Sequence, residues 1–265
     1  MIPAEINHES LKPIVQEAGR ILLSYFDKKL TFTLKDQSGF VTEADLASEK
    51  YLIESLGNLL PQAAFFAEES GKSGSGDYCW VIDPLDGTTN FAHRLPYFCI
   101  SVALTYQDKP IVGAIYQPLL DDFFYAQRGG GATLNGVQVW VREQHDLSRT
   151  VMAVGFPYAK NKQFMELVEG VQRILPETHA LRYFGAVALD LAYVAAGSLD
   201  GAFFEGLGWW DVAAGIVLIE EAGGIVTDFA GCQVGPDYVS FVAANEPMHE
   251  KLLHLLTVRP ASNPR

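Results

Sequence analysis

The spacing of apolar residues predicts two amphipathic helices near the start of the chain. Between residues 5 and 26, apolar side chains recur every three or four positions, which is the period of a helix with one buried face. A second helix is expected over residues 42–56, because Thr42 can cap it and Asp45 follows three residues later, as in a capping box. Residues 30–41 mix Thr, Phe and Leu with a glycine, which predicts a strand or a hairpin.

A dense alternation of apolar runs and turn residues after Pro61 predicts the strands of one sheet. The runs are residues 63–67, 79–82, 99–106, 111–116, 123–127 and 132–140. The glycine- and serine-rich run at residues 71–76 is typical of a surface loop. The three consecutive glycines at 129–131 are typical of a turn between strands.

The second half of the chain alternates helix and strand patterns, which predicts an α/β fold. The expected helices are residues 187–196, 212–222 and 247–256, the last of them capped by Asn245. The expected strands are residues 201–205, 224–228 and 239–243. We expect residues 1–265 to form a single domain, with a lobe boundary near residues 142–151 and a loose tail at the end.

Charge and cysteine content narrow the classes of function. The chain of 265 residues is 49% hydrophobic, enough for a large core, and has a formal charge of −13. This charge argues against direct binding of nucleic acid or of an anionic membrane, because phosphate groups demand clustered Lys and Arg. The three cysteines are widely spaced, so we expect neither disulfides nor a zinc site. This use of cysteine also predicts a cytoplasmic location. No export signal or membrane span is recognised.

Two acids that flank a proline form the most informative segment of the chain. Asp83 and Asp86 follow a buried-strand pattern, Pro84 stiffens the turn between them, and Gly87 allows close approach of a ligand. Two carboxylates and the Leu85 carbonyl could supply three of the oxygen ligands that Mg²⁺ requires. The backbone N–H groups after Gly87 could hold a phosphate. An ordinary Asp-Pro turn that ends a strand is the alternative.

Further acids lie upstream and downstream of this turn. Glu68 and Glu69 directly follow the apolar run at residues 63–67, and on an extended chain they would point to opposite sides. Asp211 begins a helix of small residues, where it could also serve only as an N-cap.

These segments, taken together and in this order, resemble the inositol monophosphatase family, and its bacterial members most of all. The matching segments read EES at Glu68–Ser70, DPLDGTTNF at Asp83–Phe91 and WDVAAG at Trp210–Gly215. VTEAD at Val41–Asp45 and LDLAYVAAGSLDG at Leu189–Gly201 are similar to the family as well. The resemblance implies a layered α-β-α-β-α sandwich of the inositol monophosphatase and fructose bisphosphatase type.

The resemblance also assigns roles to individual residues. The implied metal ligands are the carboxylates of Glu68, Asp83, Asp86 and Asp211 and the carbonyl of Leu85, with Glu69 in support. Thr88 and Glu68 are implied to orient the attacking water, and Asp45 to be the partner of Thr88. Asp86, Asp211 and the backbone amides of Gly87 and Thr88 would face the phosphate.

Contacts to the alcohol part of the substrate are implied for Gly185, Ala186, Val187 and Glu205. The chain departs from the family pattern at two of these positions. Ala186 stands where many relatives carry Ser or Thr, and Glu205 lies six residues before Asp211, one fewer than is usual in the family. These departures bear on the preference for one phosphorylated polyol over another.

The implied function is Mg²⁺-dependent hydrolysis of myo-inositol monophosphate by direct attack of water, with Li⁺ as an inhibitor and a homodimer as the assembly. Three phosphatases of the same superfamily are alternatives, with fructose bisphosphate, histidinol phosphate or a nucleotide 3′-phosphate as substrate. An additional regulatory role in transcription, through binding of transcription factors, is an alternative of another class. Metal cations would supply the positive charge that an acidic protein needs to handle an anionic ester.

Overall fold

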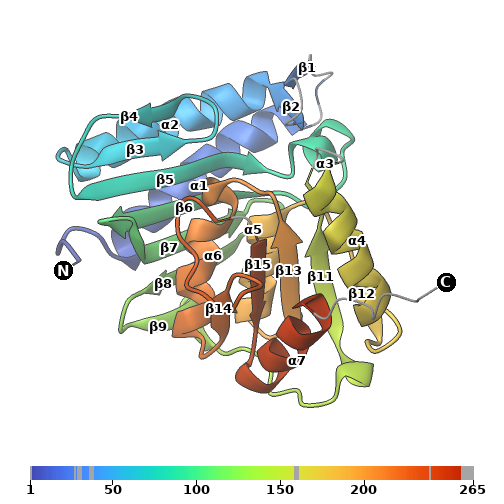
Figure 1. Ribbon diagram of the computed structural model, residues 1–265. Coiled ribbons are helices and arrows are strands. Elements are labelled where there is room, and N and C mark those ends of the chain that lie inside the picture. Colours follow the sequence, from blue (N-terminus) through green and yellow to red (C-terminus); the bar gives the residue numbers. More distant parts are fainter. Residues whose placement is uncertain are drawn as a thin grey trace.

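Two β-sheets separated by helices organise the chain in the computed structural model, which describes residues 2–26, 28, 32–35, 39–157, 161–238 and 240–257 (Figure 1). The larger sheet has the strand order β10-β9-β8-β7-β6-β5-β3-β4. Its strands are β3 (Ala64–Ala67), β4 (Gly71–Ser73), β5 (Tyr78–Asp86), β6 (Cys99–Tyr106), β7 (Lys109–Gln117), β8 (Asp122–Gln127), β9 (Gly131–Leu134) and β10 (Val137–Val139). Only β3 and β5 pair in parallel, and the other neighbours are antiparallel.

The apolar runs after Pro61 all enter this one sheet, as predicted, but two details differ from the sequence analysis. The run at 132–140 is two strands, because Asn135 and Gly136 both adopt positive φ angles, of 50° and 80°, and form a hairpin turn. The expected loop at 71–76 begins as the edge strand β4, which pairs with β3. The glycines at 129–131 form the expected turn, and the Glu221 carboxylate accepts hydrogen bonds from two of their N–H groups.

The smaller sheet has the order β12-β11-β13-β15-β14. Its strands are β11 (Val151–Gly155), β12 (Ala180–Arg182), β13 (Gly201–Glu205), β14 (Ile225–Thr227) and β15 (Ser240–Ala244). The strands expected in the second half are confirmed within one or two residues, although Val239 lies outside the described residues. A further two-stranded pairing joins β1 (Phe32–Lys35) to β2 (Gly39–Thr42), in line with the strands expected over residues 30–41. Residues 30, 31 and 36–38 of that expectation lie outside the described residues.

Helices cover both faces of each sheet, so the layers run α-β-α-β-α (Figure 1). The first layer is α1 (His8–Phe26) and α2 (Glu43–Leu59), the middle layer is α5 (Val187–Ala195) and α6 (Trp209–Glu221), and the last layer is α4 (Lys162–Ile174) and α7 (Glu246–Thr257). The short helix α3 (Thr88–Ala92) follows β5. The predicted layered sandwich is therefore confirmed. The described helices include none with the length and apolar character of a membrane span.

Buried apolar side chains fill the spaces between these layers. Leu52 and Trp80 belong to the core between the first helices and the larger sheet, and Ile115 and Phe204 to the core around the middle helices. Small residues bring the middle layer close to the larger sheet, because a Cβ atom on Gly113 would lie 2.4 Å from the Ala214 carbonyl oxygen. The Ser101 hydroxyl donates to the Trp210 carbonyl at 3.2 Å, which fixes the start of α6 over β6. Asp211 is positioned by this packing.

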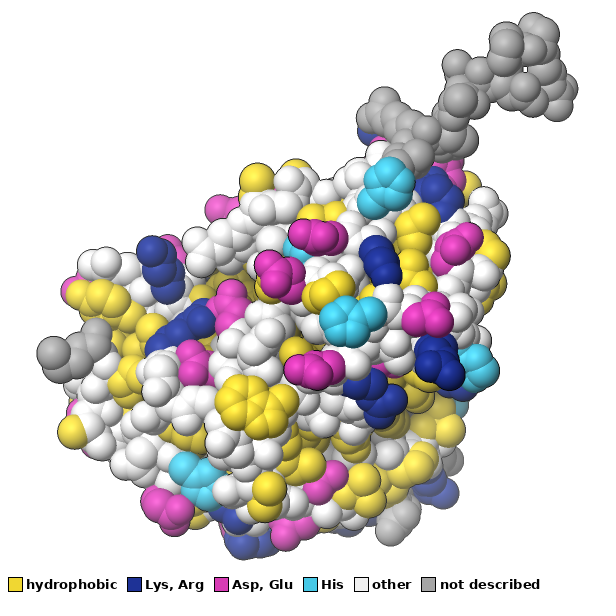
Figure 2. All heavy atoms as spheres, turned by 90° about the horizontal axis from the view of Figure 1, so that it is seen from below, with side chains coloured by type: hydrophobic (Ala, Val, Ile, Leu, Met, Phe, Trp, Pro, Cys, Tyr) yellow, Lys and Arg dark blue, Asp and Glu magenta, His cyan; other side chains and the backbone are white. Residues whose placement is uncertain are grey.

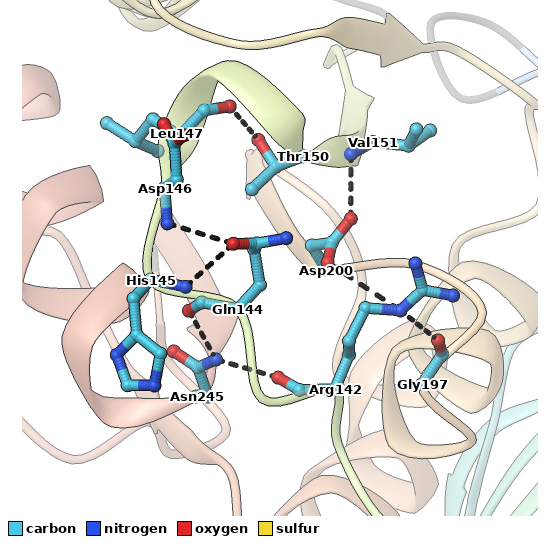
Figure 3. Close-up of polar contacts among 10 residues, drawn as sticks. All are labelled: Arg142, Gln144, His145, Asp146, Leu147, Thr150, Val151, Gly197, Asp200 and Asn245. Carbon is cyan, nitrogen blue, oxygen red and sulfur yellow. Dashed lines mark hydrogen bonds and ion pairs between the residues drawn. The ribbon is translucent and has the colours of Figure 1, made fainter.

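The connection between the two sheets, residues 140–150, is held by side chains of the smaller-sheet region (Figure 3). The Asn245 amide donates to the carbonyls of Arg142 and Gln144, at 2.7 and 2.9 Å. The Asp200 carboxylate accepts from the Val151 N–H at 2.8 Å, at the first residue of β11. Asn245 also caps α7, as expected, by accepting from the Met248 N–H. The single domain with a lobe boundary at this connection stays a prediction.

The face seen in Figure 2 carries acidic and basic side chains that are interspersed rather than segregated. Lys and Arg side chains do not gather into a continuous patch on that face.

Candidate metal and phosphate site

A cavity of about 720 Å³ opens where the ends of strands from both sheets meet the starts of α3, α5 and α6. Most of the residues singled out from the sequence line it. They are Glu68, Glu69, Asp83, Leu85, Asp86, Gly87, Thr88, Gly185, Val187 and Asp211. Segments about 140 residues apart in the chain thus contribute to one site, as the ordered motifs suggested.

Three carboxylates converge on this cavity. Asp83, Asp86 and Asp211 each offer a carboxylate oxygen, and these oxygens lie within 4.8 Å of one another. On a regular strand, residues three apart would point to opposite faces. The pairing of β5 with β6 has an irregularity between Asp83 and Asp86, and this extra residue lets both acids serve one site.

Backbone donors hold each of these acids in place. The Asp83 carboxylate accepts from the Leu85 N–H at 3.0 Å, and the Asp86 carboxylate accepts from the Ala188 N–H at 2.6 Å. The Asp211 carboxylate accepts from the Gly208 N–H at 2.6 Å. Gly208 is the N-cap of α6 and Asp211 is its third residue, so the N-cap alternative for Asp211 is not what the structure shows. The three carboxylates are rigidly presented.

The electrostatics of the cluster are unfavourable for three bare anions. Burial raises the pKa of Asp83 well above its usual value, and the charges of Glu68, Asp86 and Asp211 raise it further. Burial likewise raises the pKa of Asp86 to about 7, although N–H groups at the start of α5 oppose the shift. A divalent cation would relieve this repulsion, and hard carboxylate oxygens are the donors that Mg²⁺ prefers. The donor set therefore fits a divalent metal ion.

Thr88 and Asp45 form the pair that the resemblance implied. The Thr88 hydroxyl lies 3.1 Å from a carboxylate oxygen of Asp45 and 3.0 Å from the Leu85 carbonyl oxygen. It can donate its proton to either oxygen. Asp45 completes the expected capping box with Thr42 at the start of α2. Burial raises the pKa of Asp45, while its hydrogen bonds from Thr42 and Thr88 oppose the rise. Asp45 itself is not among the residues that line the cavity and contacts it through Thr88.

Gly87 needs the conformational freedom of glycine. Its φ angle is 90°, and a Cβ atom there would lie 3.0 Å from the Tyr97 carbonyl oxygen and 3.1 Å from the Ala186 Cβ. This close packing brings the turn after Asp86 against the start of α5. The assignment of the Gly87 and Thr88 amides to the phosphate stays a prediction.

The residues predicted to contact the alcohol separate into two groups. Gly185, with a φ angle of 81°, and Val187 line the cavity. Ala186 is fully buried, and neither it nor Glu205 is among the described residues that line the cavity. Glu205 is the last residue of β13, pairs with Ser240 and is only 6% exposed. The shortened spacing to Asp211 thus coincides with a glutamate that the structure does not bring to the cavity.

Burial of Glu205 has a consequence for stability. Among the described residues, one carboxylate oxygen of Glu205 has no hydrogen-bond partner. Burial, with a contribution from Glu166, raises the pKa of Glu205 to about 7. Between the unfolded pKa near 4.5 and the folded pKa near 7, the folded state binds the proton more tightly, so stability falls as pH rises. We expect Glu205→Gln to raise the free energy of unfolding at pH 8 by about 1 kcal/mol, after allowance for solvent screening, and to change it little at pH 4.

Urea unfolding of both proteins at the two pH values, without metal, measures this difference. Glu177→Gln is the matched control, because Glu177 is exposed and its replacement should have no pH-dependent effect. An equal effect of Glu205→Gln at both pH values would show that folding does not raise the pKa of Glu205.

Three polar residues support the site without having been recognised from the sequence. The Asn90 amide donates to the carbonyls of Tyr97 and Phe184, both at 2.8 Å, and so ties the turn of Gly87 to the segment before Gly185. Ser48 and Glu49 lie one turn after Asp45 on α2 and contact the backbone of the site. The available signal was their spacing of three and four residues from Asp45, which places them on the same side of the helix.

The layered α/β fold and the carboxylate cluster fit an enzyme that uses a divalent metal ion. Comparison with known proteins specifies the family. The model of the inositol monophosphatase family matches residues 8–259. A protein named inositol-1-monophosphatase from Mesorhizobium japonicum is 39% identical over 89% of this chain and 91% of its own length. A protein named Nus factor SuhB from Escherichia coli K12 is 41% identical over 83% of each chain.

A crystal structure of extragenic suppressor protein suhB from Bartonella henselae superposes with a TM-score of 0.88 at 36% identity, covering 94% of this chain and 97% of that one. The chain belongs to the inositol monophosphatase family. The family and the phosphatase class predicted from its motifs are therefore confirmed.

Proposed function

We propose that this chain is a Mg²⁺-dependent phosphomonoesterase that hydrolyses myo-inositol monophosphate to inositol and inorganic phosphate. The convergence of Asp83, Asp86 and Asp211, with oxygens within 4.8 Å of one another in the cavity, carries the proposal. Glu68 lines the same cavity and is the fourth acid of the proposed metal centre. The bound cation would neutralise phosphate charge and lower the pKa of a water molecule.

The proposed reaction is direct attack of water on phosphorus, with cleavage of the bond to the alcohol oxygen. Thr88 orients the attacking water through its hydroxyl oxygen, because its own proton is donated to Asp45. Asp45 is buried, so its carboxylate can accept a proton that passes from the water through Thr88. The alcohol leaves with a proton taken from solvent. The described residues that line the cavity include no Ser or Cys, which supports a route without a covalent phosphoenzyme.

Several finer properties belong to the same proposal. The family relationship supports Mg²⁺ as the cation, inhibition by Li⁺, a homodimer and a cytoplasmic location. Gly185 and Val187 are proposed to contact the alcohol, whereas Ala186 acts only through the packing of α5 against Gly87.

Phosphate release from several esters on one plate tests the substrate. Inositol 1-phosphate is compared with fructose 1,6-bisphosphate, histidinol phosphate and adenosine 3′,5′-bisphosphate, each with Mg²⁺ and with or without Li⁺. Fast, lithium-sensitive turnover of the inositol ester supports the proposal. Faster turnover of another ester would identify that ester as the substrate, while the proposed metal-dependent reaction would remain the same.

A second role, binding to transcription factors, is favoured by the relatives that carry the name Nus factor SuhB, one of them at 41% identity. Pull-down with purified components of the transcription machinery tests it, using the chain and its Asp86→Asn variant. Binding that is equal for both proteins would establish a role independent of catalysis. Absence of binding to every component would leave hydrolysis as the function.

A further inference from the structure

One side of α2 carries three buried polar residues that face the metal and phosphate site. Asp45, Ser48 and Glu49 are spaced three and four residues apart, and their exposed fractions are 0%, 0% and 4%. This spacing places their side chains together on one face of the helix. Buried polar groups are costly unless they are hydrogen-bonded, so each of them should have a partner.

Each residue of this face contacts a different part of the site. Asp45 accepts from the Thr88 hydroxyl at 3.1 Å, and the Ser48 hydroxyl donates to the Pro84 carbonyl at 3.0 Å. Glu49 uses both carboxylate oxygens, which accept from the N–H groups of the two residues after Glu68, each at 2.9 Å. A single helix thus connects the turn that carries Asp83 and Asp86 to the segment that carries Glu68.

The Glu49 contact fixes the backbone of the residues that follow Glu68 in the chain. At Glu68 itself, the N–H donates to the Ile82 carbonyl at 3.1 Å and so continues the pairing of β3 with β5 by one residue. Beyond Glu68 the strand has ended, and the N–H groups of Glu69 and Ser70 are bound by Glu49 instead. Hydrogen bonds to an ionised carboxylate are stronger than neutral ones, so this clamp holds the turn firmly.

We propose that Glu49 is a positioning residue for the metal centre, which sets the place of the Glu68 carboxylate relative to Asp83 and Asp86. The inference deepens the proposed function and rests on it. Because Glu49 binds the backbone of the turn, its loss lets Glu68 move relative to the other acids. Outer residues that orient metal ligands typically contribute about 10- to 100-fold to metal affinity. Glu49 therefore determines how tightly the site binds a divalent cation.

Binding of Mg²⁺ to the metal-free protein, measured by isothermal titration calorimetry, tests this role. Glu49→Gln keeps the size of the side chain but replaces one acceptor oxygen with an amide that faces a backbone N–H. We expect its dissociation constant for Mg²⁺ to rise about 10-fold or more. The lost rate of phosphate release should be recovered by raising the Mg²⁺ concentration. Glu54→Gln is the matched control, because Glu54 is exposed on the same helix and should leave the affinity unchanged.

A purely structural role of Glu49 would give a different result. In that case Glu49→Gln would lower the free energy of unfolding but leave the Mg²⁺ dissociation constant of the folded protein unchanged, and the inference would be wrong. If the unaltered chain bound no Mg²⁺, the proposed function itself would fail. Should Glu49→Gln not fold, Glu49→Asp replaces it: the charge remains, but the shorter side chain cannot reach both N–H groups, and the same loss of affinity is expected.

Discussion

Asp86→Asn should lower the rate of phosphate release by about 10³-fold and at the same time stabilise the metal-free protein. A metal ligand contributes several kcal/mol to charge stabilisation in the transition state, and each 1.4 kcal/mol corresponds to about a tenfold change in rate. Asp86 is also one of three clustered acids, and burial raises its pKa to about 7. The folded state therefore holds the Asp86 proton more tightly than the unfolded chain does, so stability falls as pH rises from 3.8 to about 7 and is lowest above that pH.

The neutral amide avoids the cost of burying a charge beside Glu68 and can still accept the hydrogen bond from Ala188. We expect the free energy of unfolding at pH 8, without metal, to rise by about 2 kcal/mol. Phosphate assays and urea unfolding with and without Mg²⁺ measure both effects. Asp108→Asn is the control, because Asp108 is exposed and asparagine tolerates its φ angle of 63°. Full activity of a folded Asp86→Asn variant would exclude Asp86 as a ligand.

Thr88→Val should lower kcat by about 10²- to 10³-fold with a much smaller change in Mg²⁺ affinity. Valine has nearly the shape of threonine but lacks the hydroxyl that lies 3.1 Å from Asp45 and faces the cavity. The variant thus loses the group that orients the attacking water, whereas Asp83, Asp86 and Asp211 remain in place. Steady-state kinetics at saturating Mg²⁺ measure the effect.

Thr88→Ser is the matched control for this prediction. Serine keeps the hydroxyl and its contact with Asp45, so most of the activity should be retained. Equal losses in the valine and serine variants would indicate that Thr88 acts through packing of α3 rather than through its hydroxyl. An unchanged kcat in the valine variant would exclude the Thr88–Asp45 pair from proton transfer.

The sequence predicted best those features that depend on local pattern. The capping box of Thr42 and Asp45 is present, the apolar runs of the larger sheet pair with one another, and the ordered acidic motifs line one cavity. Each of these follows from residues a few positions apart or from motifs long enough to be specific. The resemblance added the layered fold, which local patterns alone could not specify.

Several features that depend on distant partners were missed. Glu49 bonds to a backbone about 20 residues away, so its spacing from Asp45 indicated the side of the helix but could not indicate this partner. Contact of Glu205 with the alcohol was implied by the resemblance and stays a prediction, although Glu205 pairs with Ser240 and is not among the described residues that line the cavity. The strands β11 and β12 were not predicted; β11 pairs with β12 and with β13, across long stretches of chain. Helix α4 was also missed, although its cap Asn161 and the helical spacing of its buried residues Leu167 and Ile174 were local signals.

Titration of Mg²⁺ into the metal-free protein, with inositol 1-phosphate as the substrate and released phosphate as the readout, tests the central claim most directly. The account predicts no turnover in the presence of a chelator and a saturable rise as Mg²⁺ is added, with the rise lost in Asp86→Asn. Undiminished turnover in the chelator would contradict a metal-dependent reaction at Asp83, Asp86 and Asp211.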